Sequence, residues 1–204
     1  MTNPKLLEKL EACGAIIQNT HVVLASGQHS SGYVNFKLPL TGPAFALDCG
    51  RALAEPFIHD KVDVVVGPAM GAIPLALGCA LHLGHFNLQR TKCVPAERGE
   101  KGSFSIRPSF HDLISHKRIL VVEDVVTSGG SVRSVLRAIR KVGGKVVGVA
   151  AICNRGVTTK HTLRVPRYEP LLQLEIPAWT AQDCPLCQQG VPINQTVGHG
   201  RRSA

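Results

Sequence analysis

The sequence predicts an α/β fold with a mainly parallel central sheet flanked by helices. Three runs rich in β-branched residues, at 62–66, 119–122 and 145–152, lack any alternation of polar and apolar residues. Such runs are typical of parallel strands that are covered on both faces. Helical patterns lie between them, and alternating strands and helices are typical of a doubly wound sheet.

Two helices are expected between these strands. Residues 71–83 form an apolar helical pattern with Pro74 near its start, where proline is tolerated. Residues 131–142 carry four large apolar residues at the i, i+3, i+4, i+7 spacing of one helix face, with basic residues facing away. Gly143 and Gly144 follow directly and close this helix.

Length, composition and charge narrow the class of protein. The chain has 204 residues, of which 44% are hydrophobic, enough for one domain with a full core. The formal net charge of +9 fits a solvated basic surface, a nucleic-acid partner or a polyphosphate substrate. Aromatic residues make up only 4% and no nucleic-acid module is present, so we expect no nucleic-acid partner.

No run of the sequence approaches the roughly 20 apolar residues of a membrane-spanning helix, and no membrane partner is expected. Residues 1–14 are charged and amphipathic, unlike a signal peptide, which predicts a cytoplasmic location. Residues 97–110, rich in Gly, Ser and charge, are expected to form a long loop or a flexible hairpin with a functional role. Residues 178–204 look like a tail with little periodicity, disordered towards its end.

The stretch from Ile119 to Ser131 is the most informative in the chain. A buried strand ends in two acids, a loop of small residues follows, and then a helix begins. A helix N-terminus with nearby glycines and hydroxyls can bind a phosphate. The adjacent acids suit a ribose and a nearby Mg²⁺. A tight turn with capping residues is the alternative, and neither the Walker nor the Rossmann pattern fits.

This stretch resembles the PRPP-binding motif of the type I phosphoribosyltransferases, where PRPP is 5-phosphoribosyl 1-diphosphate. In that family the loop holds the 5-phosphate and the acids contact the ribose hydroxyls. The resemblance implies the type I phosphoribosyltransferase fold, with a small hood subdomain beside the sheet. The implied PRPP-binding residues are Glu123, Asp124, Val125, Val126, Thr127, Ser128, Gly129, Gly130 and Ser131.

Other segments resemble the orotate-specific branch of this family over about residues 10–192. Residues 24–33 resemble its hood segment, residues 67–71 its pyrophosphate loop, and residues 184–192 the C-terminal part of one bacterial branch. Arg155 matches the position of the orotate-binding arginine, and an arginine suits the carboxylate of orotate. Ala25 and Gly71 stand where many of these enzymes have lysine.

The resemblance implies a transferase that converts PRPP and orotate into orotidine 5'-monophosphate and diphosphate, in pyrimidine biosynthesis. It also implies one domain over 1–204, with a hood from about 1–40 and 165–192, a PRPP-binding core from about 41–164, and a disordered tail at 193–204. The implied residues are Lys101, Arg98 and Asp124 for catalysis, Ala69, Met70 and Gly71 for the pyrophosphate, and Thr127, Arg155, Ser26 and Gly27 for orotate.

The resemblance further implies the cofactor Mg²⁺ and a homodimer with shared active sites. The ion is expected to be held by PRPP, with Asp124 the one protein residue that assists. Two alternatives stay open: a phosphoribosyltransferase for a purine base, and a PRPP-sensing regulator that binds nucleic acid. Arg155 argues against the first, and the loop cations Arg98 and Lys101 argue against the second.

Two further features have a structural interpretation. Cys184 and Cys187 have zinc-like spacing, but one CxxC pair alone favours a structural turn. The nine histidines include no HExxH or comparable cluster, and His29 is of interest only through its place in the hood segment.

Overall fold

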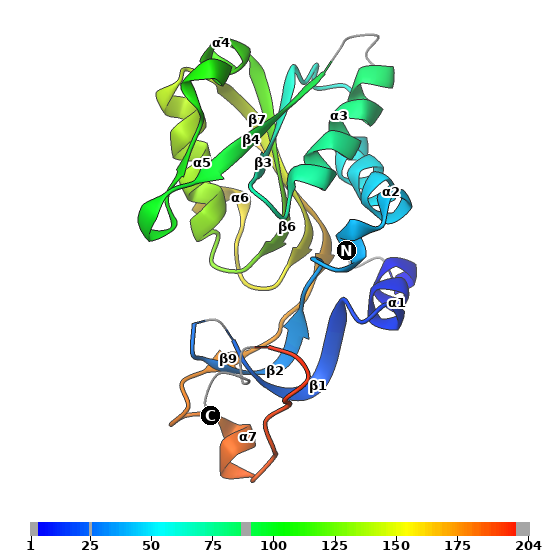
Figure 1. Cartoon of the computed structure of the whole chain (residues 1–204), viewed down its shortest axis with the longest axis vertical. Helices are drawn as coiled ribbons and strands as arrows, with labels where there is room; N and C mark the ends of the chain where they lie inside the picture. Colours follow the sequence, from blue (N-terminus) through cyan, green and yellow to red (C-terminus); the bar gives the residue numbers. More distant parts are fainter. Residues whose placement is uncertain (1–3, 25, 87–90, 199–204) are drawn as a thin grey trace. The chain divides into compact units, whose positions relative to one another are not determined.

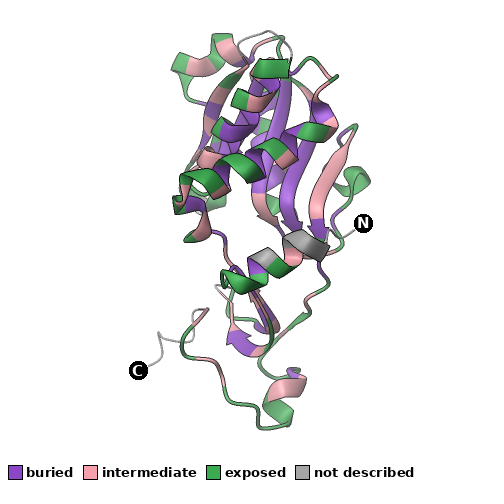
Figure 2. Cartoon of the chain, turned by 90° about the vertical axis from the view of Figure 1, so that its right-hand side faces the viewer, coloured by how far each residue is buried: buried purple, intermediate pink, exposed green. Residues whose placement is uncertain are grey.

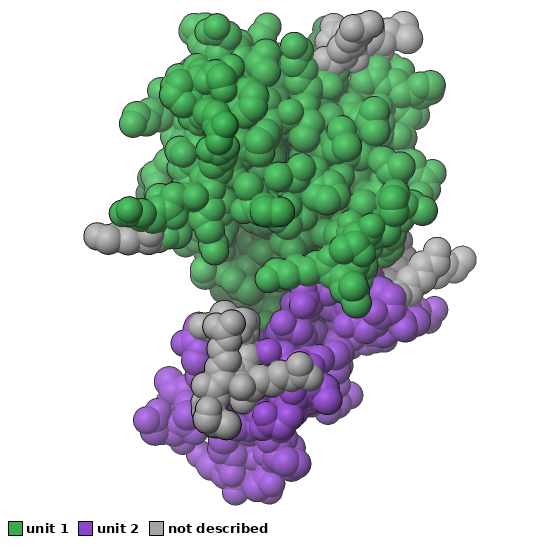
Figure 3. All heavy atoms as spheres, viewed as in Figure 1, with its two compact units in different colours: residues 1–2, 36–173 green, residues 3–35, 174–204 purple. Residues whose placement is uncertain are grey.

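The computed structural model describes residues 4–24, 26–86 and 91–198, and it leaves out the side chains of residues 4–6, 9 and 101. The chain divides into two compact units, which Figure 3 colours separately. The larger unit is formed mainly by residues 36–173, and the smaller unit combines residues 3–35 with residues 174–204. The hood and core boundaries expected from the sequence, at about residues 40 and 165, lie near these divisions.

The larger unit contains a six-stranded sheet of order β5-β4-β3-β6-β7-β8 within the described residues. Neighbouring strands pair in parallel, except that β5 runs antiparallel to β4. The mainly parallel sheet predicted from the sequence is therefore confirmed. The strands are β3 (Val64–Pro68), β4 (Lys92–Arg98), β5 (Phe104–Ser105), β6 (Arg118–Val126), β7 (Lys145–Asn154) and β8 (Tyr168–Gln173).

Helices cover both faces of this sheet. α2 (Pro43–Ala54) and α3 (Ile73–Phe86) lie on one face and α5 (Gly130–Lys141) lies on the other (Figure 1). The strands between them are largely buried (Figure 2). The four apolar residues that predict the inner face of α5 are all buried, and burying each stabilises the fold by about 1.5–3 kcal/mol. They are Val132, Val135, Leu136 and Ile139.

Glycines allow α2 and α3 to pack in direct backbone contact. A Cβ atom at Gly50 of α2 would lie 2.6 Å from the carbonyl carbon of Gly78 in α3. Any larger residue at Gly50 would therefore force the two helices apart.

Short helical turns complete the larger unit. They are η1 (Pro39–Thr41), η2 (Glu55–Phe57), η3 (Glu100–Gly102), η4 (Pro108–Phe110), α4 (His111–Ile114) and α6 (Lys160–Leu163). Of the two forms expected for residues 97–110, the structure shows the hairpin. Phe104 anchors it, because its side chain is buried and its N–H donates to Ser134 Oγ of α5 over 2.9 Å.

The smaller unit is built from both ends of the chain. Its antiparallel sheet has the order β1-β2-β9, with β1 (Ile16–Val23), β2 (His29–Val34) and β9 (Ala178–Trp179), and its helices are α1 (Pro4–Ala12) and α7 (Pro185–Gln188). Gly27 has a φ of +81° in the turn between β1 and β2, a conformation that favours glycine.

The C-terminal segment is more ordered than its lack of periodicity suggests. The prediction of little regular structure after residue 178 is wrong for β9 and α7, which are too short to produce a periodic pattern. Residues 193–204 were expected to be disordered. Within this tail, however, the N–H of Asn194 donates a hydrogen bond to His21 O over 2.7 Å. Residues 199–204 lie outside the described residues. None of the described helices is long and apolar enough to cross a membrane.

Candidate active site

A cavity of about 720 Å³ lies in the larger unit, where strands β3, β4 and β6 end. Ligands of open α/β sheets bind at the carboxyl ends of the strands, and this volume suits a small molecule. The lining residues are Lys37, Leu40, Thr41, Pro68, Ala69, Met70, Gly71, Pro74, Arg98, Phe104, Glu123, Asp124, Val125 and Ser131. The cavity therefore brings together acids, cations and the predicted pyrophosphate loop from separate parts of the chain.

A second cavity of about 160 Å³ surrounds the loop between β6 and α5, and it shares Glu123, Val125 and Ser131 with the first. Its lining contains all the predicted PRPP-binding residues except Asp124, which lines the first cavity. Gly129 is the N-cap of α5 with a φ of +73°, and no side chain caps the helix. The first N–H groups of α5 and the positive end of its dipole are thus available to an anion.

The loop is held in place through its carbonyl oxygens. Thr158 Oγ1 donates to Thr127 O over 2.7 Å, and Arg133 Nη1 donates to Ser128 O over 2.7 Å. The Arg155 N–H donates to Val126 O, also over 2.7 Å. Preorganised donors bind an anion without the cost of ordering the loop, so this bracing favours a phosphate site.

The two acids at the end of β6 differ in environment. Burial raises the pKa of Glu123 well above its usual value, and the neighbouring Asp124 carboxylate raises it further, which favours the protonated form. Asp124 is half-buried, and its Oδ1 accepts a hydrogen bond from the Val125 N–H over 2.7 Å. Asp124 is therefore the carboxylate best suited to meet a cation or sugar hydroxyls in the cavity.

The predicted pyrophosphate loop lies against this acid. A Cβ atom built at Gly71 would be 3.4 Å from Asp124 Oδ2. The Ala69 N–H donates to Ala96 O of β4 over 2.8 Å, and the Ala69–Met70 peptide bond is cis. Because of the short distance from the position of this Cβ atom to Asp124 Oδ2, any side chain at position 71 would contact the Asp124 carboxylate.

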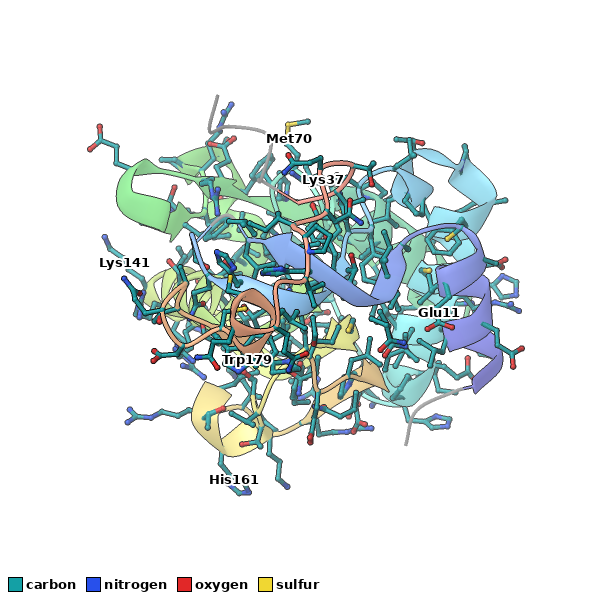
Figure 4. The ribbon with its side chains drawn as sticks, turned by 90° about the horizontal axis from the view of Figure 1, so that it is seen from below. Glu11, Lys37, Met70, Lys141, His161 and Trp179 are labelled. Atoms are coloured by element: carbon teal, nitrogen blue, oxygen red, sulfur yellow. The ribbon has the colours of Figure 1, made fainter. Side chains whose placement is uncertain are left out.

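Two described cations line the larger cavity. Arg98, predicted from the sequence, lies at the end of β4 with its guanidinium 5.8 Å from the centre of the Phe104 ring. Lys37, which was not expected from the sequence, also lies in the lining with Met70, and both are labelled in Figure 4. No short motif surrounds Lys37, so only the fold reveals it. Lys101 belongs to η3, but its side chain lies outside the described side chains.

The residues predicted to bind orotate are not all brought to this cavity. Thr127 lines the smaller cavity, whereas Arg155 lines neither of the two. Ser26 and Gly27 belong to the β1–β2 turn of the smaller unit, where Ser26 Oγ lies 3.3 Å from Gln28 Oε1. The roles of Arg155, Ser26 and Gly27 therefore stay predictions.

Comparison with known proteins is consistent with this geometry. Residues 40–172 match the family model described as "Phosphoribosyl transferase domain". The chain is 37% identical over 189 residues to an orotate phosphoribosyltransferase of Caldanaerobacter subterraneus subsp. tengcongensis, covering 93% of this chain and 92% of the relative.

Solved structures of Mycobacterium tuberculosis H37Rv orotate phosphoribosyltransferase share the fold. The complex with inorganic phosphate is 25% identical, with a TM-score of 0.65 over 84% of this chain and 97% of the other. The complex with PRPP is 24% identical, with a TM-score of 0.63 over 83% of this chain and 94% of the other. The type I phosphoribosyltransferase fold predicted from the sequence is thereby confirmed.

Proposed function

Since this chain belongs to the phosphoribosyl transferase family, and within it to the orotate phosphoribosyltransferases, we propose that it makes orotidine 5'-monophosphate from PRPP and orotate. Diphosphate is the second product, and the reaction belongs to pyrimidine biosynthesis. One observation carries the proposal: two adjoining cavities are lined by Glu123 and Asp124, by residues 127–131, which we call the phosphate cradle, by residues 69–71 and by Arg98.

The cradle is proposed to hold the 5-phosphate of PRPP. Backbone N–H groups at the start of α5 donate to the phosphate, and the hydroxyls of Thr127, Ser128 and Ser131 add donors. Asp124 accepts hydrogen bonds from the ribose hydroxyls in the adjoining cavity. A substrate held at both ends in this way presents its C1 carbon in a fixed position for attack.

The larger cavity is proposed to hold the diphosphate as it leaves. The C1–diphosphate bond loosens while the orotate nitrogen approaches, so negative charge develops on the diphosphate. Arg98 and Lys37 lie in the cavity lining, where they stabilise this charge. Lys101 is proposed to act with Arg98, since it belongs to η3, the turn that follows β4.

Mg²⁺ fits this site through one residue. Carboxylate oxygens are preferred ligands of Mg²⁺, and the Asp124 carboxylate lies in the cavity lining. Glu123 fits less well, because its raised pKa favours the protonated form. When bound, Mg²⁺ would act as a Lewis acid towards the diphosphate oxygens. Asp124 would orient the metal-bound substrate without supplying the whole ligand set.

Orotate recognition is proposed to depend on Arg155 and Thr127 of the larger unit, and a part in it for Ser26 and Gly27 of the smaller unit stays a prediction. Arg155 follows β7 and is fixed by the bond from its N–H to Val126 O, next to the cradle loop. A guanidinium forms charge-assisted and bidentate hydrogen bonds with a carboxylate. A neutral purine base offers no such group, so the family relationship and Arg155 both favour orotate.

We also propose a homodimer and a cytoplasmic location. Leu47 of α2 and Leu77 and Leu81 of α3 are about half exposed, and they provide an apolar helix face for a second copy. None of the seven cysteines forms a disulfide in the structure, which is typical of proteins of a reducing compartment.

A panel of bases tests the proposed reaction. The protein is incubated with PRPP, Mg²⁺ and either orotate, uracil, adenine or hypoxanthine, and loss of each base is followed. Only orotate should be consumed. Uracil is the informative control, because it differs from orotate by the carboxylate alone. Turnover of a purine base at a rate comparable to that of orotate would contradict the proposal. A result in which none of the four bases is consumed would contradict it as well.

A further inference from the structure

Four side chains of types that can bind a metal meet in the smaller unit, and none of them is among the residues that line the active-site cavity. They are His21 of β1, His29 of β2, and Cys184 and Cys187 at the two ends of the first turn of α7. One ligand atom of each lies within 4.8 Å of those of the others. The turn that the sequence favours for Cys184 and Cys187 therefore also brings both thiols close to two histidines. The sequence could not show the cluster, because more than 150 residues separate its halves.

The distances are close to those of a tetrahedral site. Zinc bonds to nitrogen and sulfur predict edges of about 3.3 Å between two nitrogens and about 3.6 Å between nitrogen and sulfur. His21 Nε2 lies 3.6 Å from Cys184 Sγ and 3.7 Å from Cys187 Sγ. His29 Nδ1 lies 3.2 Å from Cys187 Sγ and 2.8 Å from His21 Nε2. Metal uptake would thus require only a small separation of the two rings.

The other ring nitrogen of His21 fixes its orientation. His21 Nδ1 lies 2.7 Å from Val191 O, and a carbonyl oxygen can only accept, so Nδ1 carries the proton. The lone pair of Nε2 consequently points into the cluster. Metal-binding histidines are typically oriented in this way by a carbonyl or carboxylate. The Val191 N–H in turn donates to Leu186 O over 2.9 Å, so the carbonyl is anchored to α7.

The C-terminal segment lacks a substantial apolar anchor of its own. α7 has four residues and buries none of them, and a helix of this length is not stable alone. Cys184, directly before α7, is fully buried against the cluster, and His21 and His29 are also buried. β9 has only two residues, Ala178 and Trp179, which pair with Ser30 and His29; Trp179 is labelled in Figure 4. Small units with so little core commonly depend on a metal or a disulfide.

We propose that His21, His29, Cys184 and Cys187 bind one structural Zn²⁺ ion that joins α7 to the β1–β2 hairpin. Two thiolates and two imidazoles select zinc over Mg²⁺ or Ca²⁺, which prefer oxygen ligands. Four protein ligands leave no open position for substrate, so the ion has a structural role. This site is separate from the Mg²⁺ proposed for the active site, and it does not depend on the proposed reaction.

Metal analysis of untagged, reduced protein tests the site directly. After incubation with Zn²⁺ and removal of excess metal, wild type should retain about one zinc ion per chain, and Cys187→Ser should retain less than about a tenth of that. Cys187 is exposed, so its loss leaves no cavity in the core. Cys13→Ser is the matched control, because Cys13 is an exposed thiol of the same unit and should not affect zinc content.

Cobalt substitution and unfolding add readouts independent of enzymatic activity. Wild type loaded with Co²⁺ should show the visible bands of a tetrahedral site and a thiolate charge-transfer band, and His29→Gln should weaken both. A strong chelator should lower the melting temperature of wild type and leave that of Cys187→Ser unchanged. Equal zinc retention by wild type and Cys187→Ser would overturn the proposal. So would a Co²⁺ spectrum without thiolate bands.

Discussion

Replacing Gly129 by alanine should destabilise the loop between β6 and α5. Gly129 has a φ of +73°, a conformation that costs an alanine about 1–2 kcal/mol. The added Cβ would also lie 2.9 Å from Leu163 Cδ2 and 3.1 Å from Arg133 Nη1, and such overpacking costs about 1–3 kcal/mol. We therefore expect the free energy of unfolding to fall by about 2–5 kcal/mol in total.

Gly130→Ala is the matched control for this variant. A Cβ at Gly130 would find Ser128 Oγ as its nearest neighbour at 3.7 Å, an ordinary contact, and Gly130 is the first residue of α5. Its free energy of unfolding should stay within about 0.5 kcal/mol of wild type.

Thermal and urea unfolding, with and without inorganic phosphate, would measure both variants. Gly129→Ala should lower the melting temperature by roughly 5–15 °C and reduce the stabilisation that phosphate gives. The described loop geometry would be refuted if Gly129→Ala were as stable as wild type. It would also be refuted if Gly130→Ala lost as much free energy of unfolding as Gly129→Ala.

The remaining predictions concern the acids, the cations and the dimer. Asp124→Asn should keep the melting temperature but lower PRPP turnover, measured as orotate consumption; an unchanged rate would make the acid structural. Arg98→Ala and Lys101→Ala should each lower kcat by roughly 10²-fold with little change in the PRPP dissociation constant, because they act on developing charge. A loss confined to PRPP binding would assign them to the ground state. The raised pKa of Glu123 means that its carboxyl group holds a proton more tightly in the folded protein than in the unfolded protein. The free energy of unfolding should therefore fall as the pH rises above about 4.3, the pKa of an unfolded glutamate. Glu123→Gln should then be more stable than wild type at pH 8, with the difference lost at pH 4 in urea unfolding, and a pH-independent difference would exclude this cause. Leu81→Lys should halve the mass measured by light scattering, and an unchanged mass would exclude this face as the dimer contact.

The sequence predicted those parts of the fold that depend on local patterns. The β-branched runs and the apolar stripe of α5 are local, and the structure confirms them. The strand, acids and glycine loop from Glu123 to Ser131 were also recognisable, because they are contiguous in the sequence, and their role in binding phosphate stays a prediction.

The features that the sequence did not reveal depend on contacts between distant segments. Lys37 lines the same cavity as Pro68 at the end of β3, which is distant in the sequence, and no motif marks it. The cluster of His21, His29, Cys184 and Cys187 joins the two ends of the chain. β5 and β9 have two residues each, which is too short for a periodic pattern.

The most direct test of the PRPP site is a crystal structure of the protein with PRPP and Mg²⁺. The 5-phosphate should lie within hydrogen-bonding distance, about 3 Å, of the N–H groups of residues 129–131 at the start of α5. The ribose hydroxyls should face Asp124, and the diphosphate should lie beside residues 69–71 and Arg98. A 5-phosphate bound away from the 127–131 loop, or a diphosphate outside the larger cavity, would contradict the assignment.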